Sequence, residues 1–148
     1  MAETGSEMET ETDTREGADG EKAEGERDPP SLLGRLLFGG VLAYTAIDGF
    51  RNLDGQIAYA EANGVPVPER LVPLATGLLA FGSVGVALWR VPRLATAAVV
   101  TFLAAITPTM HDFWNAPDEQ RGNERNHFVK NVAMLGAAVA FLRRATGR

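Results

Sequence analysis

The chain has 148 residues, of which 45% are hydrophobic and 22% charged, and its formal net charge is −5. These averages resemble those of an ordinary soluble domain, but they combine two very different segments. Because the chain has no cysteine, it forms no disulfide, thiolate nucleophile or iron–sulfur ligand of its own, and any redox role requires a cofactor or a partner. Nothing in the composition indicates a nucleic-acid partner.

Residues 1–30 form an acidic segment. It contains eleven of the nineteen acidic residues and three basic ones, a charge of −8, and it lacks aromatic residues, leucine, isoleucine and valine. Such a sequence buries too little apolar surface to offset the entropy of ordering, so we predict a disordered acidic tail. Composition leaves open whether this tail only solubilises the protein or also recruits a partner.

Two long uncharged runs lie in the middle of the chain. Residues 71–89 and 94–110 contain no Asp, Glu, Lys or Arg. A helix of about 20 apolar residues crosses the roughly 30 Å hydrocarbon layer of a bilayer. Neither run has a polar face to present to water, which argues against a soluble four-helix protein. We predict that both are transmembrane helices.

Two weaker apolar runs flank them, at residues 32–50 and 127–143. Their charged residues lie near the ends, from which long side chains reach the membrane surface. The predicted fold is therefore all-α, a four-transmembrane-helix bundle over residues 31–148 that follows the disordered tail. A short helix is expected at residues 56–63, ending before Gly64, with Tyr59 on the membrane surface.

Small residues four positions apart allow close packing of helices in lipid. Five such pairs occur in the predicted spans: Gly39 with Ala43, Ser83 with Ala87, Thr101 with Ala105, Ala133 with Ala137, and Gly136 with Ala140. They favour a tightly packed bundle.

Four spans place both termini on one side of the membrane, together with the connection after the second span. The arginines of that side are Arg35, Arg90, Arg93, Arg143, Arg144 and Arg148. Because cytoplasmic loops are enriched in Lys and Arg, we predict a multi-pass protein of the cytoplasmic membrane with both termini in the cytoplasm.

The polar residues of the spans gather at the opposite, outer end. They are Asp48, Arg51 and Asn52 after the first span, His111 and Asp112 after the third, and His127, Lys130 and Asn131 at the start of the fourth. Polar groups at membrane depth are paired, turned inward or functional. One interpretation is structural, with Asp48 paired to Arg51 and Asp112 to Lys130, and the other is a binding site. Pro108 is expected to kink or end the third span there.

His111 and His127 are expected at the same level on adjacent antiparallel helices. That geometry would suit a bis-histidine haem, or a metal site completed by Asp112 or Glu124. Two histidines without a motif spacing are weak evidence, so we assign no metal site and disfavour haem. Nucleotide-binding loops, hydrolase elbows and HExxH zinc motifs do not occur in the sequence.

Several segments together resemble the DoxX family. They are IDGFRNL at the end of the first span, EANGVPVPERLVPLATGLLAFGSVGVAL through the second, HDFW after the third and NHFVKNVAMLGAAVAFL in the fourth. The resemblance extends over about residues 32–142. It implies a small four-span bundle of the cytoplasmic membrane, and some members are associated with membrane oxidoreductases, including a thiosulfate-quinone oxidoreductase.

We therefore expect an accessory subunit of a membrane redox complex that acts as an enzyme only within that complex. The sequence assigns no cofactor, and a quinone is the candidate, with His111 and Asp112 handling protons and Arg51 or Lys130 stabilising an anionic head group. The expected partners are the lipid bilayer and a protein of the redox complex, while homo-oligomerisation stays open. The alternative is a non-enzymatic membrane scaffold or permeation protein.

Overall fold

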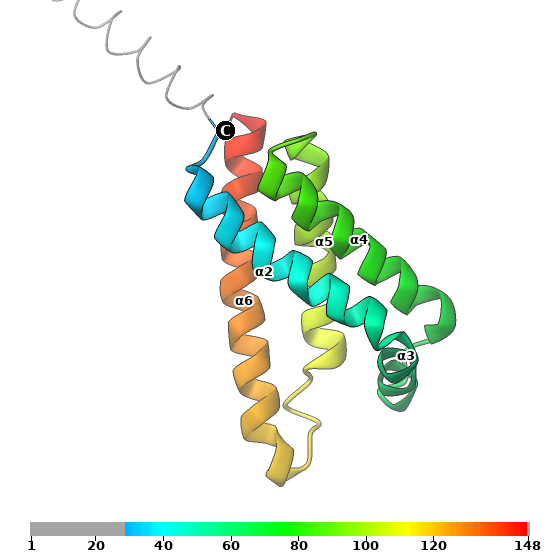
Figure 1. Cartoon of the computed structure of the whole chain (residues 1–148). Helices are drawn as coiled ribbons and strands as arrows, with labels where there is room; N and C mark the ends of the chain where they lie inside the picture. Colours follow the sequence, from blue (N-terminus) through cyan, green and yellow to red (C-terminus); the bar gives the residue numbers. More distant parts are fainter. Residues whose placement is uncertain (1–28, 148) are drawn as a thin grey trace, which may run out of the picture.

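The computed structural model describes residues 29–147, and this part of the chain is all α-helical. The helices are α2 (Leu32–Arg51), α3 (Leu53–Ala62), α4 (Pro68–Leu88), α5 (Pro92–Met110) and α6 (Asp118–Thr146). Most of the predicted acidic tail lies outside the described residues, as does Arg148. In Figure 1, α2 runs beside α4 and crosses in front of α6, and the short α3 lies at one end beside the start of α4.

The long helices pack in three pairs: α2 with α4, α4 with α5, and α5 with α6. Helix α6 is antiparallel to α5 and lies along the whole bundle. Near its C-terminus, Phe141 stacks on Phe38 of α2, with ring centroids 5.1 Å apart. Near its N-terminus, Phe128 contacts Phe113 in the loop after α5, with centroids 5.4 Å apart. Both ends of the bundle are therefore closed by aromatic contacts.

The helix starts follow from local sequence. The hydroxyl of Ser31 accepts a hydrogen bond from the Gly34 amide at 3.2 Å and caps α2. Helices α4 and α5 begin at Pro68 and Pro92, where a proline costs no helical hydrogen bond. The tight connection between α4 and α5 places Trp89 and Val91 in the left-handed region, with φ angles of 53° and 44°.

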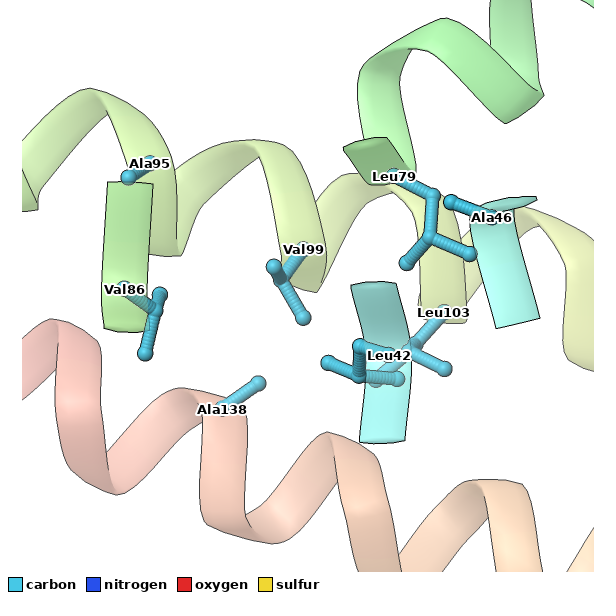
Figure 2. Close-up of a cluster of buried hydrophobic side chains, with 8 residues drawn as sticks. All are labelled: Leu42, Ala46, Leu79, Val86, Ala95, Val99, Leu103 and Ala138. Carbon is cyan, nitrogen blue, oxygen red and sulfur yellow. The ribbon is translucent and has the colours of Figure 1, made fainter. Parts of the chain in front are cut away.

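The core is narrow and built from small aliphatic side chains. Its buried members are Leu42, Ala46, Leu79, Val86, Ala95, Val99, Leu103 and Ala138. Figure 2 shows side chains of α2, α4, α5 and α6 converging on this cluster. All four long helices therefore share one core.

Glycines allow the closest helix approaches. A Cβ on Gly39 would lie 2.7 Å from the Ser83 carbonyl oxygen and 2.9 Å from the Ala87 Cβ, so α2 and α4 touch through their backbones there. A Cβ on Gly82 would lie 2.7 Å from Val99 of α5. The predicted packing role of Gly39 and of Ser83 with Ala87 is confirmed. Gly136, in contrast, has open space around it, and its pairing prediction finds no support.

Three helices, α2, α4 and α5, are long and apolar enough to cross a membrane. Of the most apolar 18-residue segment of each helix, only 17% is buried inside the bundle in α2, 28% in α4 and 39% in α5. Large aliphatic side chains such as Leu33, Leu74 and Leu94 point outward, each more than 60% exposed. Burying so little of three apolar helices is unfavourable in water and favourable in lipid, so the bundle is membrane-embedded.

The buried hydroxyls fit this environment. Thr76, Thr96 and Thr107 each donate to a carbonyl oxygen four residues earlier in the same helix, and Ser83 donates to the Ala80 carbonyl. Since an unsatisfied polar group in hydrocarbon costs several kcal/mol, these local bonds let polar side chains lie among apolar helices.

The observed helix bounds extend beyond the predicted spans. Helix α6 begins at Asp118 rather than near 127, α4 at Pro68 rather than 71, and α3 at Leu53 rather than 56. The predicted bounds followed the uncharged residues, whereas helices continue past the hydrocarbon wherever hydrogen bonding and propensity permit. The extra turns of α6 include Glu, Gln and Arg, which favour helix, and its acidic first residues complement the helix dipole.

Candidate functional site

The candidate site lies where α5 ends and α6 begins. His111 is the C-cap of α5, and its amide donates to the Thr107 carbonyl at 3.2 Å. Pro108 was expected to kink or end this helix. The helix ends two residues beyond it, at Met110.

His111 forms an ion-pair contact with Glu124 of α6. The distance between its Nδ1 and the Glu124 Oε2 is 2.8 Å, and the two side chains are 21% and 17% exposed. Because an ionised carboxylate only accepts hydrogen bonds, this contact assigns a hydrogen to Nδ1. In the neutral ring Nε2 is then the acceptor, and this nitrogen is the one that can take up or release a proton.

His127 completes the cluster. Its ring lies nearly parallel to that of His111, with an interplanar angle of 15° and centroids 5.1 Å apart. Glu124 and His127 are three residues apart on α6, and this spacing places both on one face of the helix. The prediction that the two histidines meet at one level on adjacent helices is confirmed.

Tyr59 links the loop helix α3 to this end of the bundle. Its hydroxyl donates to the Met110 carbonyl oxygen at 3.1 Å. Partial burial raises the pKa of Tyr59, the negative charges of Glu124 and Asp112 raise it further, and a hydrogen bond with Asn63 opposes them. The charges of Glu124 and Asp112 therefore act on the Tyr59 hydroxyl and disfavour its ionisation.

Aromatic side chains hold the α5–α6 loop in place. Phe113, Trp114 and Phe128 pack edge to face in all three pairs, with centroids 5.2 to 5.8 Å apart. Trp114 is also 51% exposed, as expected for an aromatic residue at a membrane surface. This aromatic cluster fixes His111 against the first turns of α6.

Asp112 has a local partner. Its carboxylate accepts from the Asn115 side-chain amide at 3.0 Å, and its carbonyl oxygen accepts from the Asn115 backbone amide at 2.8 Å. These bonds close a tight turn. Asp112 is therefore bonded to Asn115, and the suggested ion pair of Asp112 with Lys130 is not formed among the described residues.

The other predicted site residues lie around the cluster without joining it. Asp48, Arg51 and Asn52 lie at the end of α2, and the Asp48 carbonyl oxygen accepts from the Asn52 amide at 3.0 Å. Among the described residues, no ion pair joins Asp48 to Arg51, so that suggested pairing is not formed. Lys130 and Asn131 lie on α6, one turn beyond His127.

Between residues 29 and 147, no hydrogen bond or ion pair connects these five residues with the histidines. Their role in binding stays a prediction. Over the same range, no group of three or more His, Asp or Glu side chains is arranged to hold a metal ion.

Sequence reasoning named Glu124 only as a possible metal ligand beside the histidines, and it did not place Tyr59 at the site. Glu124 carried a usable signal, since it lies one helical turn before His127. Tyr59 carried none, because its contact with Met110 joins residues 51 positions apart and depends on how α3 folds back.

Apolar helices with outward-facing side chains, closed at one end by a polar cluster, define a membrane-embedded α-helical bundle protein. Residues 31–112, more than half of the chain, match the DoxX family model. The chain belongs to the DoxX family. The matched range covers α2 to α5 and ends at Asp112, so Glu124 and His127 lie beyond it. Neither a curated protein nor a solved structure matches the chain significantly.

Proposed function

We propose that this DoxX protein is an accessory subunit of a quinone-linked membrane redox complex, in which the cluster of His111, Glu124 and His127 transfers protons. The hydrogen-bonded pair of His111 and Glu124 beside a stacked histidine, at one end of a membrane bundle, carries the proposal. Proton-transferring side chains at a membrane boundary are what quinone reduction requires from the surrounding protein.

The proposal includes α6 as a fourth span. This helix has 29 residues, about 43 Å at 1.5 Å per residue, which exceeds the hydrocarbon thickness. Near its C-terminus, Phe141 contacts Phe38 of α2, and in its N-terminal half Phe128 contacts Phe113 of the loop after α5. Because α6 packs along α5, one of the three helices long and apolar enough to cross a membrane, we place α6 in the membrane beside it.

The orientation follows from charge. All eight acidic residues after residue 30 lie at the end that holds the histidines. The opposite end carries six arginines, counting Arg148, against five Lys or Arg at the histidine end, and the side richer in Lys and Arg is favoured as the cytoplasmic one. Both termini are therefore cytoplasmic in the proposed arrangement, and the histidines face outward.

In this role His111 acts through Nε2, because Glu124 engages Nδ1 and fixes the ring. Reduction of a quinone to a quinol takes two electrons and two protons. The partner subunit supplies the electrons, and this chain exchanges protons with the quinone oxygens. Asp112, Arg51 and Lys130 belong to the proposal as surrounding polar groups, with Arg51 or Lys130 stabilising an anionic head group.

The test is turnover in membranes that contain the partner. His111→Ala and Glu124→Gln are expected to lower partner-dependent quinone reduction by about 100-fold and 10-fold, respectively, while the protein still assembles. Asp118→Asn is the matched control, since its exposed pair with Arg121 lies on the same helix without touching the cluster. Unchanged turnover in both cluster variants would contradict the proposal and favour the scaffold alternative.

A further inference from the structure

The end of the bundle opposite the histidines carries five arginines. They are Arg35 near the start of α2, Arg90 and Arg93 around the α4–α5 turn, and Arg143 and Arg144 near the end of α6. Figure 1 shows the start of α2, the α4–α5 turn and the end of α6 at the same end of the molecule. The helix ends that meet there, residues 29–38, 86–95 and 139–147, contain no Asp or Glu.

Side-chain contacts join these helix ends into one surface, which we call the arginine end. The guanidinium of Arg35 lies 5.9 Å from the centroid of the Trp89 ring. Phe141 of α6 packs against that tryptophan, with ring centroids 6.3 Å apart. The Nε of Arg93 donates to the Ala145 carbonyl oxygen at 3.1 Å. Helices α2, α5 and α6 and the α4–α5 turn thus hold their arginines at one end of the bundle, beside a group of aromatic rings.

Arg35 has an unmet requirement for an acceptor. Its Nε is buried and has no hydrogen-bond partner. No other buried side-chain nitrogen or oxygen of the described residues lacks one. The face of Trp89 offers the charge only a cation–π contact. A buried guanidinium donor without an acceptor is costly, so an acceptor near Arg35 would be bound favourably.

No acidic side chain of the described bundle meets this requirement. Every acidic residue between 29 and 147 lies at the histidine end, at the far side of the bundle. The counter-charge must therefore come from outside the bundle. In a membrane, the groups at the level of helix ends and interfacial aromatic rings are lipid head groups, and anionic phosphate matches the arginines in charge and geometry.

We propose that the arginine end binds the phosphate of an anionic phospholipid, with Arg35, Arg90 and Arg93 as its principal ligands. The aromatic base of Phe38, Trp89 and Phe141 places the arginines at head-group depth, and the exposed leucines of α2 contact the acyl chains. Arg35 supplies the buried donor, and the exposed Arg90 and Arg93 supply the charge that selects anionic over zwitterionic lipid. This site is independent of the proposed redox role and requires only that the helices span a bilayer.

The test measures lipid binding to the full chain purified in detergent. Native mass spectrometry counts bound phosphatidylglycerol and phosphatidylcholine at equal concentrations, and we expect preferential retention of phosphatidylglycerol. Each arginine near a membrane surface contributes about fivefold to binding of anionic lipid. Arg90→Gln with Arg93→Gln should therefore weaken phosphatidylglycerol binding by about 25-fold and leave phosphatidylcholine binding unchanged.

Arg70→Gln with Arg125→Gln is the matched control, because it removes two exposed arginines from the opposite end. Arg35→Lys keeps the charge but removes Nε, and it should weaken phosphatidylglycerol binding while the bundle stays folded. Equal retention of both lipids, or equal losses in the two double variants, would overturn the proposal. So would displacement of phosphatidylglycerol by inorganic phosphate at millimolar concentration, or a lipid preference that appears only after residues 1–28 are removed.

Discussion

Two long-range contacts made by single side chains determine the histidine end of the molecule. The Tyr59 hydroxyl bonds the Met110 carbonyl oxygen, and the His111 ring bonds Glu124. Met110 and His111 are adjacent, so the end of α5 is held from two sides. One contact comes from the loop helix α3 and the other from α6.

Replacing Tyr59 tests the first of these contacts. Tyr59→Phe removes one partly buried hydrogen bond and is expected to lower the free energy of unfolding by about 1 kcal/mol at neutral pH. The measurement is thermal unfolding of the purified protein in detergent, with Tyr44→Phe as the control because its ring is 69% exposed. A Tyr59→Phe protein as stable as the parent would contradict a structural role for this bond.

The raised pKa of Tyr59 gives the same residue a pH signature. Its pKa lies above the ordinary 10.0 in the folded protein, so the folded state holds the proton more tightly than the unfolded chain. The stabilisation is therefore complete below pH 10 and is lost as the pH rises through the folded-state pKa. In unfolding series between pH 8 and 11, the parent should lose stability faster than Tyr59→Phe. Parallel curves would show that the phenol does not titrate as argued.

At the residue scale the sequence predicted part of the site. The sequence could bring His111 and His127 together because they lie at the ends of two adjacent predicted helices. Their positions along the helix axes are enough to predict that they lie at the same level. Glu124 could be named only as a possible metal ligand, and the contact from Tyr59 could not be placed, because these contacts depend on the rotation of α6 and the path of α3. Uncharged runs carry no information on either.

At the element scale, helix packing depends on where the glycines lie. Gly39 and Gly40 are neighbours on α2, but a Cβ on Gly39 would meet the α4 backbone at 2.7 Å, and a Cβ on Gly40 would meet nothing within 4 Å. Backbone does not move aside as a flexible side chain does. The two glycines therefore form a matched pair for testing the contact between α2 and α4.

Gly39→Ala is expected to destabilise the bundle by about 2 kcal/mol, because the added methyl group forces α2 away from α4. Gly40→Ala should be neutral or slightly stabilising, since alanine favours the helix and space is open. Thermal unfolding of both variants in the same detergent measures the difference. Equal unfolding temperatures would contradict the close contact of α2 with α4.

Membrane-spanning segments were easier to predict than the exact starts and ends of the helices. Apolar runs identified α2, α4 and α5 within a few residues, because hydrocarbon selects for uncharged sequence. The start of α6 was missed by nine residues, because its first turns are charged and lie outside any apolar run. Helix ends in water are set by capping and propensity, and those signals are weaker than hydropathy.

At the scale of the whole molecule, charge divides the bundle into two unlike ends. One end has arginines without acids, and the other has all the acids of the described bundle together with the histidine cluster. Both proposals depend on this division. The lipid site requires the arginine end to lie at one membrane surface, and the proton-transfer site requires the histidine end to lie at the other.

The most direct test of this arrangement is the side of the membrane on which each end lies, and the absence of native cysteine makes it clean. Single cysteines are introduced at the histidine end by Ala62→Cys or Asn123→Cys, and at the arginine end by Pro29→Cys or by one cysteine added after Arg148. Labelling of intact cells with a membrane-impermeant maleimide should modify the first two positions, and the last two only after permeabilisation. Labelling of Asn123→Cys and the C-terminal cysteine from the same side would contradict a spanning α6 and the outward-facing histidine cluster.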